Sequence, residues 1–257
     1  MLIFIFILGL CVGSFLNVVI ERLPRGESII KKRSYCPSCK KNLKWYDMIP
    51  VFSFVFLKGK CRFCQSPISF QYPTVELVTG VLFVGVIWGI REIGEIGDIW
   101  TIGYSLFIVS SLIAIFFIDL KYGIIPDKII YPAFIVSFLY ILLNTYYLIL
   151  SHLFSAIGAF LFFLLIFLIT RGRGMGFGDV KLSFLMGLVL GFPGVVIALY
   201  SAFLTGAFAS IILVVLGKKK IKGGTIPFGP FLVFGTVTCF LWGPQLTHAF
   251  LVLLHIV

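Results

Sequence analysis

Long apolar runs follow one another through most of the chain, and they constrain its fold more than any other feature. They fall at about residues 1–20, 73–90, 101–118, 129–148, 151–170, 180–191, 195–216 and 225–242. A helix needs about 20 apolar residues to cross the hydrocarbon core of a bilayer, whereas the strands of a barrel alternate over short segments. Of the 257 residues, 60% are hydrophobic and only 12% are charged, which leaves no room for a large soluble domain. We therefore expect an all-α polytopic membrane protein with about eight transmembrane helices in a lipid bilayer.

The basic residues predict the orientation of these helices. The run at 1–20 has no basic residue at its start and no small-residue cleavage site, so we expect a retained first helix rather than a cleaved signal peptide. If its N-terminus lies outside, every Lys and Arg except Arg91 falls in or beside a cytoplasmic segment, as the positive-inside rule requires. This placement explains the formal net charge of +11 without nucleic acid as a partner. We expect three parts: the first helix at 1–20, a cytoplasmic loop domain at 21–72 and a transmembrane core at 73–257.

Two C-x-x-C pairs lie in the polar loop at 21–72, formed by Cys36 with Cys39 and by Cys61 with Cys64. Each pair can supply two ligands from one tight turn, so the pattern predicts a structural zinc site with four thiolates. Four protein ligands leave no open position for a water molecule, and the metal would therefore stabilise the loop without taking part in a reaction. Two disulfides and an iron–sulfur site are the alternatives, and a reducing cytoplasmic location disfavours the disulfides.

Two carboxylates stand where predicted helices reach the cytoplasmic border. Asp119 ends the apolar run at 111–118, and Asp179 follows Gly176-Phe177-Gly178 and opens another run. A carboxylate at this depth is costly and marks a functional site. Two carboxylates that meet can share a proton, so that one acts as general base on a water molecule while the other polarises a peptide carbonyl. The alternative for Asp179 is a purely structural role as the cap of a helix.

Two further acidic residues lie close to predicted helix starts. Asp127 follows Ile125-Pro126, and we expect it to be an ordinary helix cap. Glu76 lies in the first turns of the second predicted helix. For Glu76 two interpretations stay open, an ion pair with Arg22 and an ion pair with a cation on a substrate.

Taken together, these motifs resemble the bacterial prepilin peptidases, also called type IV leader peptidases, which are membrane aspartyl proteases with a G-x-G-D motif. The resemblance rests on the order and spacing of the segments at 13–20, 22–24, 36–39, 61–64, 72–77, 118–119, 125–127, 176–181 and 226–230. It implies that Asp119 and Asp179 are the catalytic pair. It also implies that the substrate is a type IV prepilin or pseudopilin precursor, cut at the cytoplasmic face of the bacterial inner membrane.

The resemblance implies a second activity. Long-loop members of the family methylate the newly exposed amino group, usually of phenylalanine, with S-adenosylmethionine as the methyl donor, and the loop at 21–72 makes this chain similar to them. The chain has no glycine motif for nucleotide binding, so the residues that bind this donor are not predicted. We expect methyl transfer to depend on the loop and on the residues near its two ends, which are Gly13 to Asn17, Arg22 and Glu76.

Two other classes of membrane protein fit part of the pattern. Proteases of the presenilin or signal-peptide-peptidase type also use a G-x-G-D aspartate, but the zinc loop and the segment at 13–24 argue against that group. A transporter with a zinc-stabilised loop could use Asp119 and Asp179 to carry protons or bind cations. Such a transporter should have polar groups near the bilayer midplane, whereas these acids cluster at one border, where a substrate could be cut.

Overall fold

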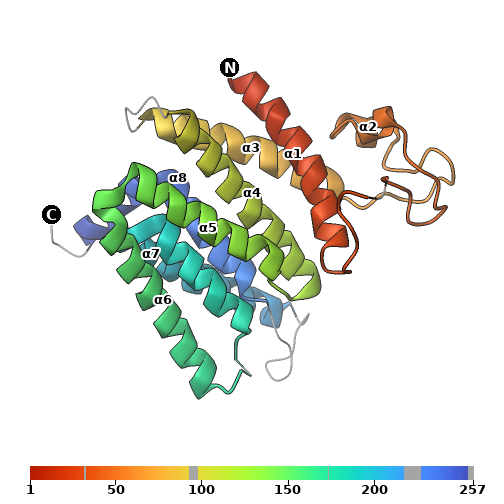
Figure 1. The fold of residues 1–257 in the computed structure, drawn as a ribbon. Coiled ribbons are helices and arrows are strands. Elements are labelled where there is room, and N and C mark those ends of the chain that lie inside the picture. The colour runs from red at the N-terminus through yellow and green to blue at the C-terminus, as the bar shows by residue number, and fades with distance from the viewer. Residues whose placement is uncertain (32, 93–97, 173, 217–226, 254–257) are drawn as a thin grey trace. The chain divides into compact units, whose positions relative to one another are not determined.

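The computed structural model describes residues 1–31, 33–92, 98–172, 174–216 and 227–253 (Figure 1). Regular secondary structure in these ranges is helical, and β contacts are limited there to two isolated bridges. The α-helices are α1 (Leu2–Arg22), α2 (Phe52–Phe56), α3 (Gln71–Glu92), α4 (Ile99–Tyr122), α5 (Asp127–Asn144), α6 (Ile149–Ile169), α7 (Phe177–Val215) and α8 (Gly229–Leu253). The chain forms two compact units, Met1–Ala114 and Ile115–Val257.

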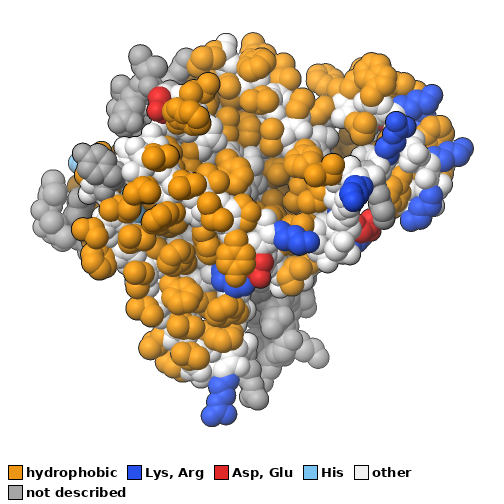
Figure 2. All heavy atoms as spheres, in the orientation of Figure 1, with side chains coloured by type: hydrophobic (Ala, Val, Ile, Leu, Met, Phe, Trp, Pro, Cys, Tyr) orange, Lys and Arg blue, Asp and Glu red, His pale blue; other side chains and the backbone are white. Residues whose placement is uncertain are grey.

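Six helices within the described ranges are long and apolar enough to cross a membrane, namely α1, α3, α4, α5, α6 and α7. Hydrophobic side chains cover much of the helical surface visible in Figure 2, while basic side chains gather over the loop between α1 and α3. The prediction of an all-α, multi-pass membrane protein is confirmed. The total of eight crossings stays a prediction.

A break in α7 separates the two short crossings predicted at 180–191 and 195–216. Gly191 has φ 62° and ψ −170°, and Phe192 has φ −94° and ψ 139°, so both residues leave the helical region. Glycine adopts a positive φ without steric cost, and the Pro193 that follows has no amide hydrogen to donate to a helix. The break therefore falls where Phe192-Pro193-Gly194 interrupts the apolar run. α8 also bends, at Trp242, but its helix continues through Gly243 and Pro244.

In the first unit, α1 and α3 pack closely as an antiparallel pair (Figure 1). A Cβ added to Gly9 would lie 2.7 Å from the Cα of Gly80, and one added to Gly13 would lie 2.7 Å from the Cα of Glu76. Four residues forward on α1 thus correspond to four residues backward on α3. Small residues at this spacing let the two backbones approach each other, which is a common way to join helices in membranes.

The second unit is built on packing of α7 against α6 and α8. A Cβ added to Gly187 of α7 would lie 2.5 Å from the backbone of Ala156 in α6. The rings of Phe163, Phe203 and Phe228 add contacts between α6, α7 and the start of α8, with centroids 5.1–6.3 Å apart. These contacts hold α6, α7 and the start of α8 together.

Candidate active site and metal centre

Asp119 lies in the last turn of α4. The helix ends at Tyr122, and the next residue, Gly123, has a φ of +66° and donates its amide to the Asp119 carbonyl at 2.8 Å. The Asp119 residue is only 5% exposed, and its Oδ2 is buried without a hydrogen-bond partner in the described part of the chain. A buried carboxylate oxygen without a partner can bind a water molecule or a substrate group.

Asp179 is the third residue of α7 and is 7% exposed. The Gly176 amide donates to its Oδ2 at 3.3 Å, which is the reach-back contact of a helix cap. The capping interpretation therefore describes one contact of Asp179. A role as a helix cap gives no reason for a second carboxylate nearby. The carboxylate of Asp119 lies close enough to that of Asp179 for the two to repel each other. The structure brings the two predicted aspartates together within the second unit.

Glycines let three chain segments converge beside this pair. A Cβ on Gly178 would lie 3.0 Å from the Cβ of Ile125, and one on Gly229 would lie 3.4 Å from the Cδ1 of the same isoleucine. A Cβ on Gly229 would also overlap the Oδ2 of Asp119. The motifs at 125–127 and 226–230 contained these residues, but their position beside the aspartates could not be read from the sequence.

Asp127 pairs with a lysine of α7. The N-cap of α5 is Pro126, so the expectation that Asp127 caps the helix is wrong: Asp127 is one residue further on, in the first turn. Instead, the Nζ of Lys181 in α7 lies 2.6 Å from its Oδ1. The side chain of Asp127 is 53% exposed, and its ion pair joins α5 to α7.

The four predicted zinc ligands meet in the loop of the first unit. The Sγ atoms of Cys36, Cys39, Cys61 and Cys64 all lie within 4.8 Å of one another, and those of Cys36 and Cys64 are 3.8 Å apart. Four thiolates at about 2.3 Å from a tetrahedral zinc have sulfur–sulfur distances of about 3.8 Å. All four cysteines are free thiols. Their arrangement fits a metal ion and not two disulfides.

Two turns of the same construction present these thiols. The Lys40 amide donates to the Cys36 carbonyl at 2.9 Å, and the Gln65 amide donates to the Cys61 carbonyl at 3.0 Å. Lys40 and Gln65 have positive φ values of 59° and 57°. Isolated bridges close the two turns at matching positions, Tyr35 with Asn42 and Lys60 with Pro67. Each turn therefore brings its two sulfur atoms to one side, which suits a shared ion.

Hydrogen bonds favour the thiolate form of Cys36. Burial raises the pKa of its thiol, but the backbone amides of Cys39 and Ser38 and the Ser66 hydroxyl more than offset this effect and lower the pKa to about 6. The Lys41 amide lowers the pKa of Cys39, whereas burial and the other three thiols raise it, with a net rise to about 11. Neighbouring thiols oppose one another's ionisation, and a bound cation removes this opposition.

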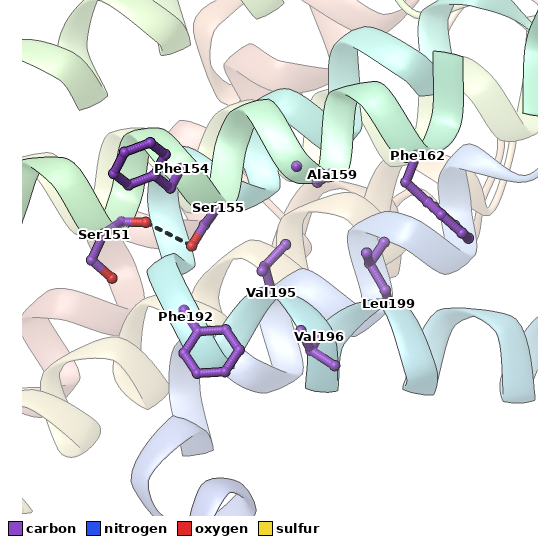
Figure 3. A pocket seen from close by; sticks show the side chains of 10 residues that line it. Ser151, Phe154, Ser155, Ala159, Phe162, Phe192, Val195, Val196 and Leu199 are labelled. Carbon is purple, nitrogen blue, oxygen red and sulfur yellow. Dashed lines mark hydrogen bonds between the residues drawn. The ribbon is translucent and has the colours of Figure 1, made fainter. Parts of the chain in front are cut away.

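An apolar cavity of about 420 Å³ lies between α6 and the part of α7 after its break (Figure 3). Phe154 and Phe162 of α6 face Phe192 and Leu199 of α7 across it. Two serines also line the cavity, and the Ser155 hydroxyl donates to the Ser151 carbonyl at 2.7 Å. None of the lining residues is titratable, so this cavity suits an apolar chain and not proton transfer.

Apolar helices, two neighbouring buried carboxylates at helix ends and a four-thiol loop together define a polytopic membrane protein with the arrangement of an aspartyl protease. Residues 7–90 match the Bacterial Peptidase A24 N-terminal domain, and residues 106–211 match the Type IV leader peptidase family. The chain belongs to the type IV leader peptidase family.

Several curated relatives support this assignment over nearly the whole chain. The chain is 35% identical over 249 residues to the prepilin leader peptidase/N-methyltransferase of Bacillus subtilis, and the match covers 96% of each protein. It is 32% identical over 275 residues to the protein of the same name from Aeromonas hydrophila, covering 96% of this chain and 92% of the relative. No solved structure matches the chain significantly.

Proposed function

We propose that this chain is a membrane aspartyl endopeptidase that removes the leader from type IV prepilin or pseudopilin precursors and then N-methylates the new N-terminal residue with S-adenosylmethionine. The observation that carries the peptidase activity is the meeting of buried Asp119 and Asp179 in the second unit. The names of the curated relatives support both activities.

The two aspartates divide the work of peptide hydrolysis. An ionised carboxylate takes a proton from a water molecule as its oxygen attacks the scissile carbonyl carbon, while the protonated partner donates to the carbonyl oxygen. The tetrahedral intermediate then breaks its C–N bond, and the proton taken from water passes to the leaving amine. The Oδ2 of Asp119, which has no hydrogen-bond partner among the described residues, offers a position for the water molecule or the carbonyl.

The place of the aspartates in their helices suits a substrate that is itself anchored in the membrane. Asp119 is at the end of an apolar helix and Asp179 at the beginning of another, so both lie near the border of the bilayer. The apolar helix of a precursor would stay in the lipid while its basic leader extends into the cytoplasm. The positive-inside distribution of Lys and Arg supports a cytoplasmic active site at the inner membrane.

Cys36, Cys39, Cys61 and Cys64 would hold one zinc ion, which would stabilise the loop. When bound, the ion supplies the positive charge that four neighbouring thiolates need. Their four sulfur atoms would complete its tetrahedral shell, so no position would be left for a substrate. The metal would therefore give the loop a fixed shape and take no part in the reaction.

A single experiment tests both activities. The purified protein in detergent is incubated with a pilin-like precursor and S-adenosylmethionine, and the product is weighed by mass spectrometry. We expect a product that has lost its leader and gained one methyl group. A precursor that stays intact would contradict the peptidase, and a product that is cut but never methylated would contradict the transferase.

A further inference from the structure

Glu76 is a buried carboxylate that peptide hydrolysis leaves unused. It lies in α3 in the first unit and is 7% exposed. The Val51 amide donates to its Oε2 at 2.7 Å, and Ser14 of α1 lies near the carboxylate. No Lys or Arg in the described ranges forms an ion pair with it. Arg22, one of the two partners considered from the sequence, donates to the loop carbonyls of Ser28, Ile29 and Arg33.

Asn17 supplies an acceptor on the facing helix that has no donor among the described residues. Its residue is 1% exposed, and its Nδ2 donates to the Tyr72 carbonyl at 3.0 Å. This bond fixes the orientation of the amide, because a carbonyl accepts only from the NH₂ end. The Oδ1 of Asn17 is consequently buried without a partner in the described part of the chain.

The register of α1 and α3 places both acceptors on one seam. Asn17 and Ser14 are three residues apart on α1, and Tyr72 and Glu76 are four residues apart on α3, so each pair shares a helix face. A Cβ added to Gly13, four residues before Asn17, would lie 2.7 Å from the Cα of Glu76, while Asn17 donates to the Tyr72 carbonyl, so the two faces meet. Glu76 and Asn17 thus both lie at the interface of α1 and α3, about one helical turn apart.

A single type of ligand satisfies both groups. A buried carboxylate without a cation and a buried carbonyl without a donor are both unfavourable in apolar surroundings. A primary ammonium has a positive charge for Glu76 and three N–H donors, one of which can reach a neutral acceptor such as Asn17.

Gln71 and Val51 lie beside these two acceptors, and Gln71 could bind the carbonyl of the first residue of a peptide. Gln71 precedes Tyr72 at the beginning of α3, and its Nε2 is a buried donor without a partner in the described ranges. The first residue of a peptide has a carbonyl oxygen beside its amine, which such a donor can bind. Val51 holds its amide toward Glu76 in a turn with φ 60° and ψ −49°, a strained conformation for a β-branched residue.

We propose that Glu76 and Asn17 bind the free α-amino group of the processed substrate, and that Glu76 removes a proton from it before methylation. This proposal rests on the N-methyltransferase activity proposed above. The ammonium gives one proton to the Glu76 carboxylate and becomes a neutral amine. Its nitrogen lone pair forms the new N–C bond as the C–S bond of the sulfonium donor breaks, and that electron pair stays on sulfur. The product is a methylated ammonium, and Glu76 returns its proton to water.

The test measures binding of a processed peptide to the full-length protein in detergent, without any methyl donor. The peptide begins with phenylalanine, continues with an apolar run without lysine, and has a fluorophore at its C-terminal end. Its partner peptide is identical except for an acetylated N-terminus. We expect the free amine to bind about tenfold more tightly than the acetylated form, because only the amine brings a charge to Glu76.

Variants assign this preference to the proposed residues. Glu76→Gln keeps the size of the side chain and an acceptor for the Val51 amide, and it should abolish the preference; Asn17→Ala should weaken it. Glu21→Gln, which changes a carboxylate at the end of α1 that pairs with Arg25, should keep it. Zinc content and thermal unfolding of each variant check that the loop and the helix pair are intact.

Three outcomes separate this proposal from the function on which it rests. An unchanged preference in Glu76→Gln overturns the proposal. The proposal is also overturned if an uncut, N-acetylated precursor displaces the labelled peptide, and if this displacement is lost both in Glu76→Gln and when the lysines of the precursor's leader are replaced. The site would then bind the leader and not the amine. Wild-type protein that cuts but never methylates contradicts the transferase activity, while the binding preference still decides whether the amine site exists.

Discussion

The carboxylate of Asp119 occupies the space that a side chain at Gly229 would fill. Gly229→Ala should therefore displace the carboxylate and reduce the rate of precursor cleavage by about 10–100-fold, since a shift of about 1 Å in a reacting group can cost that much. Gly243→Ala in the same helix is the matched control, because a Cβ there meets no atom within 4 Å. Equal cleavage by the two variants would show that Gly229 does not position Asp119.

Asp119→Asn and Asp179→Asn should each reduce cleavage by at least about 10²-fold while the protein stays folded and inserted in the membrane. Each change keeps the size of the side chain but removes its ability to take or give a proton. Cleavage of a precursor is followed by gel shift, and thermal unfolding checks the fold.

Asp127→Asn is the control for this pair and should keep most of the activity. Its partly exposed ion pair with Lys181 should contribute about 0–1 kcal/mol to the free energy of unfolding. An inactive Asp127→Asn beside an active Asp119→Asn would mean that the wrong partner of Asp179 has been chosen.

Zinc should be present at close to one ion per chain, measured by elemental analysis of the purified protein. Cys36→Ser and Cys64→Ser should lose it and make the loop sensitive to proteases, because a small loop has too little apolar core to fold without its metal. Cys11→Ser in α1 should keep the metal. Since thiolates bind the ion and protonated thiols do not, zinc should be released as the pH falls. Four oxidised thiols in native membranes, without zinc, would refute the site.

Cleavage and methylation should be separable. Asp179→Asn should leave a full-length precursor uncut and therefore unmethylated, yet it should still transfer a radiolabelled methyl group to a pilin that has been cut beforehand. The reason is that the aspartate pair lies in the unit Ile115–Val257, whereas Glu76, Asn17 and the cysteine loop lie in Met1–Ala114. Loss of methyl transfer to the pre-cut pilin by a folded Asp179→Asn protein would show that the two activities share this residue.

The features that the sequence predicted are those that depend on residues close together in the chain. A run of apolar residues long enough to span a membrane predicts a helix wherever it occurs, so the helical, membrane-spanning character followed from composition and length. The break at Gly191 and Phe192 was expected from the proline and glycine that follow. The cysteine cluster was expected from its spacing, because each C-x-x-C pair forms within one turn.

Only the tertiary structure decides which groups each of these side chains contacts. The sequence placed Asp119 and Asp179 at helix ends, but only the packing around α7 brings their carboxylates within electrostatic reach. Asp127 was expected to cap a helix, yet it pairs with Lys181, which is far away along the chain. Asn17 turns its NH₂ to Tyr72, and leaves its Oδ1 without a donor among the described residues, because α1 and α3 pack in one antiparallel register. Apolar periodicity and turn spacing are local properties, whereas contacts between helices depend on how side chains distant in the sequence fit together, and close packing allows few arrangements.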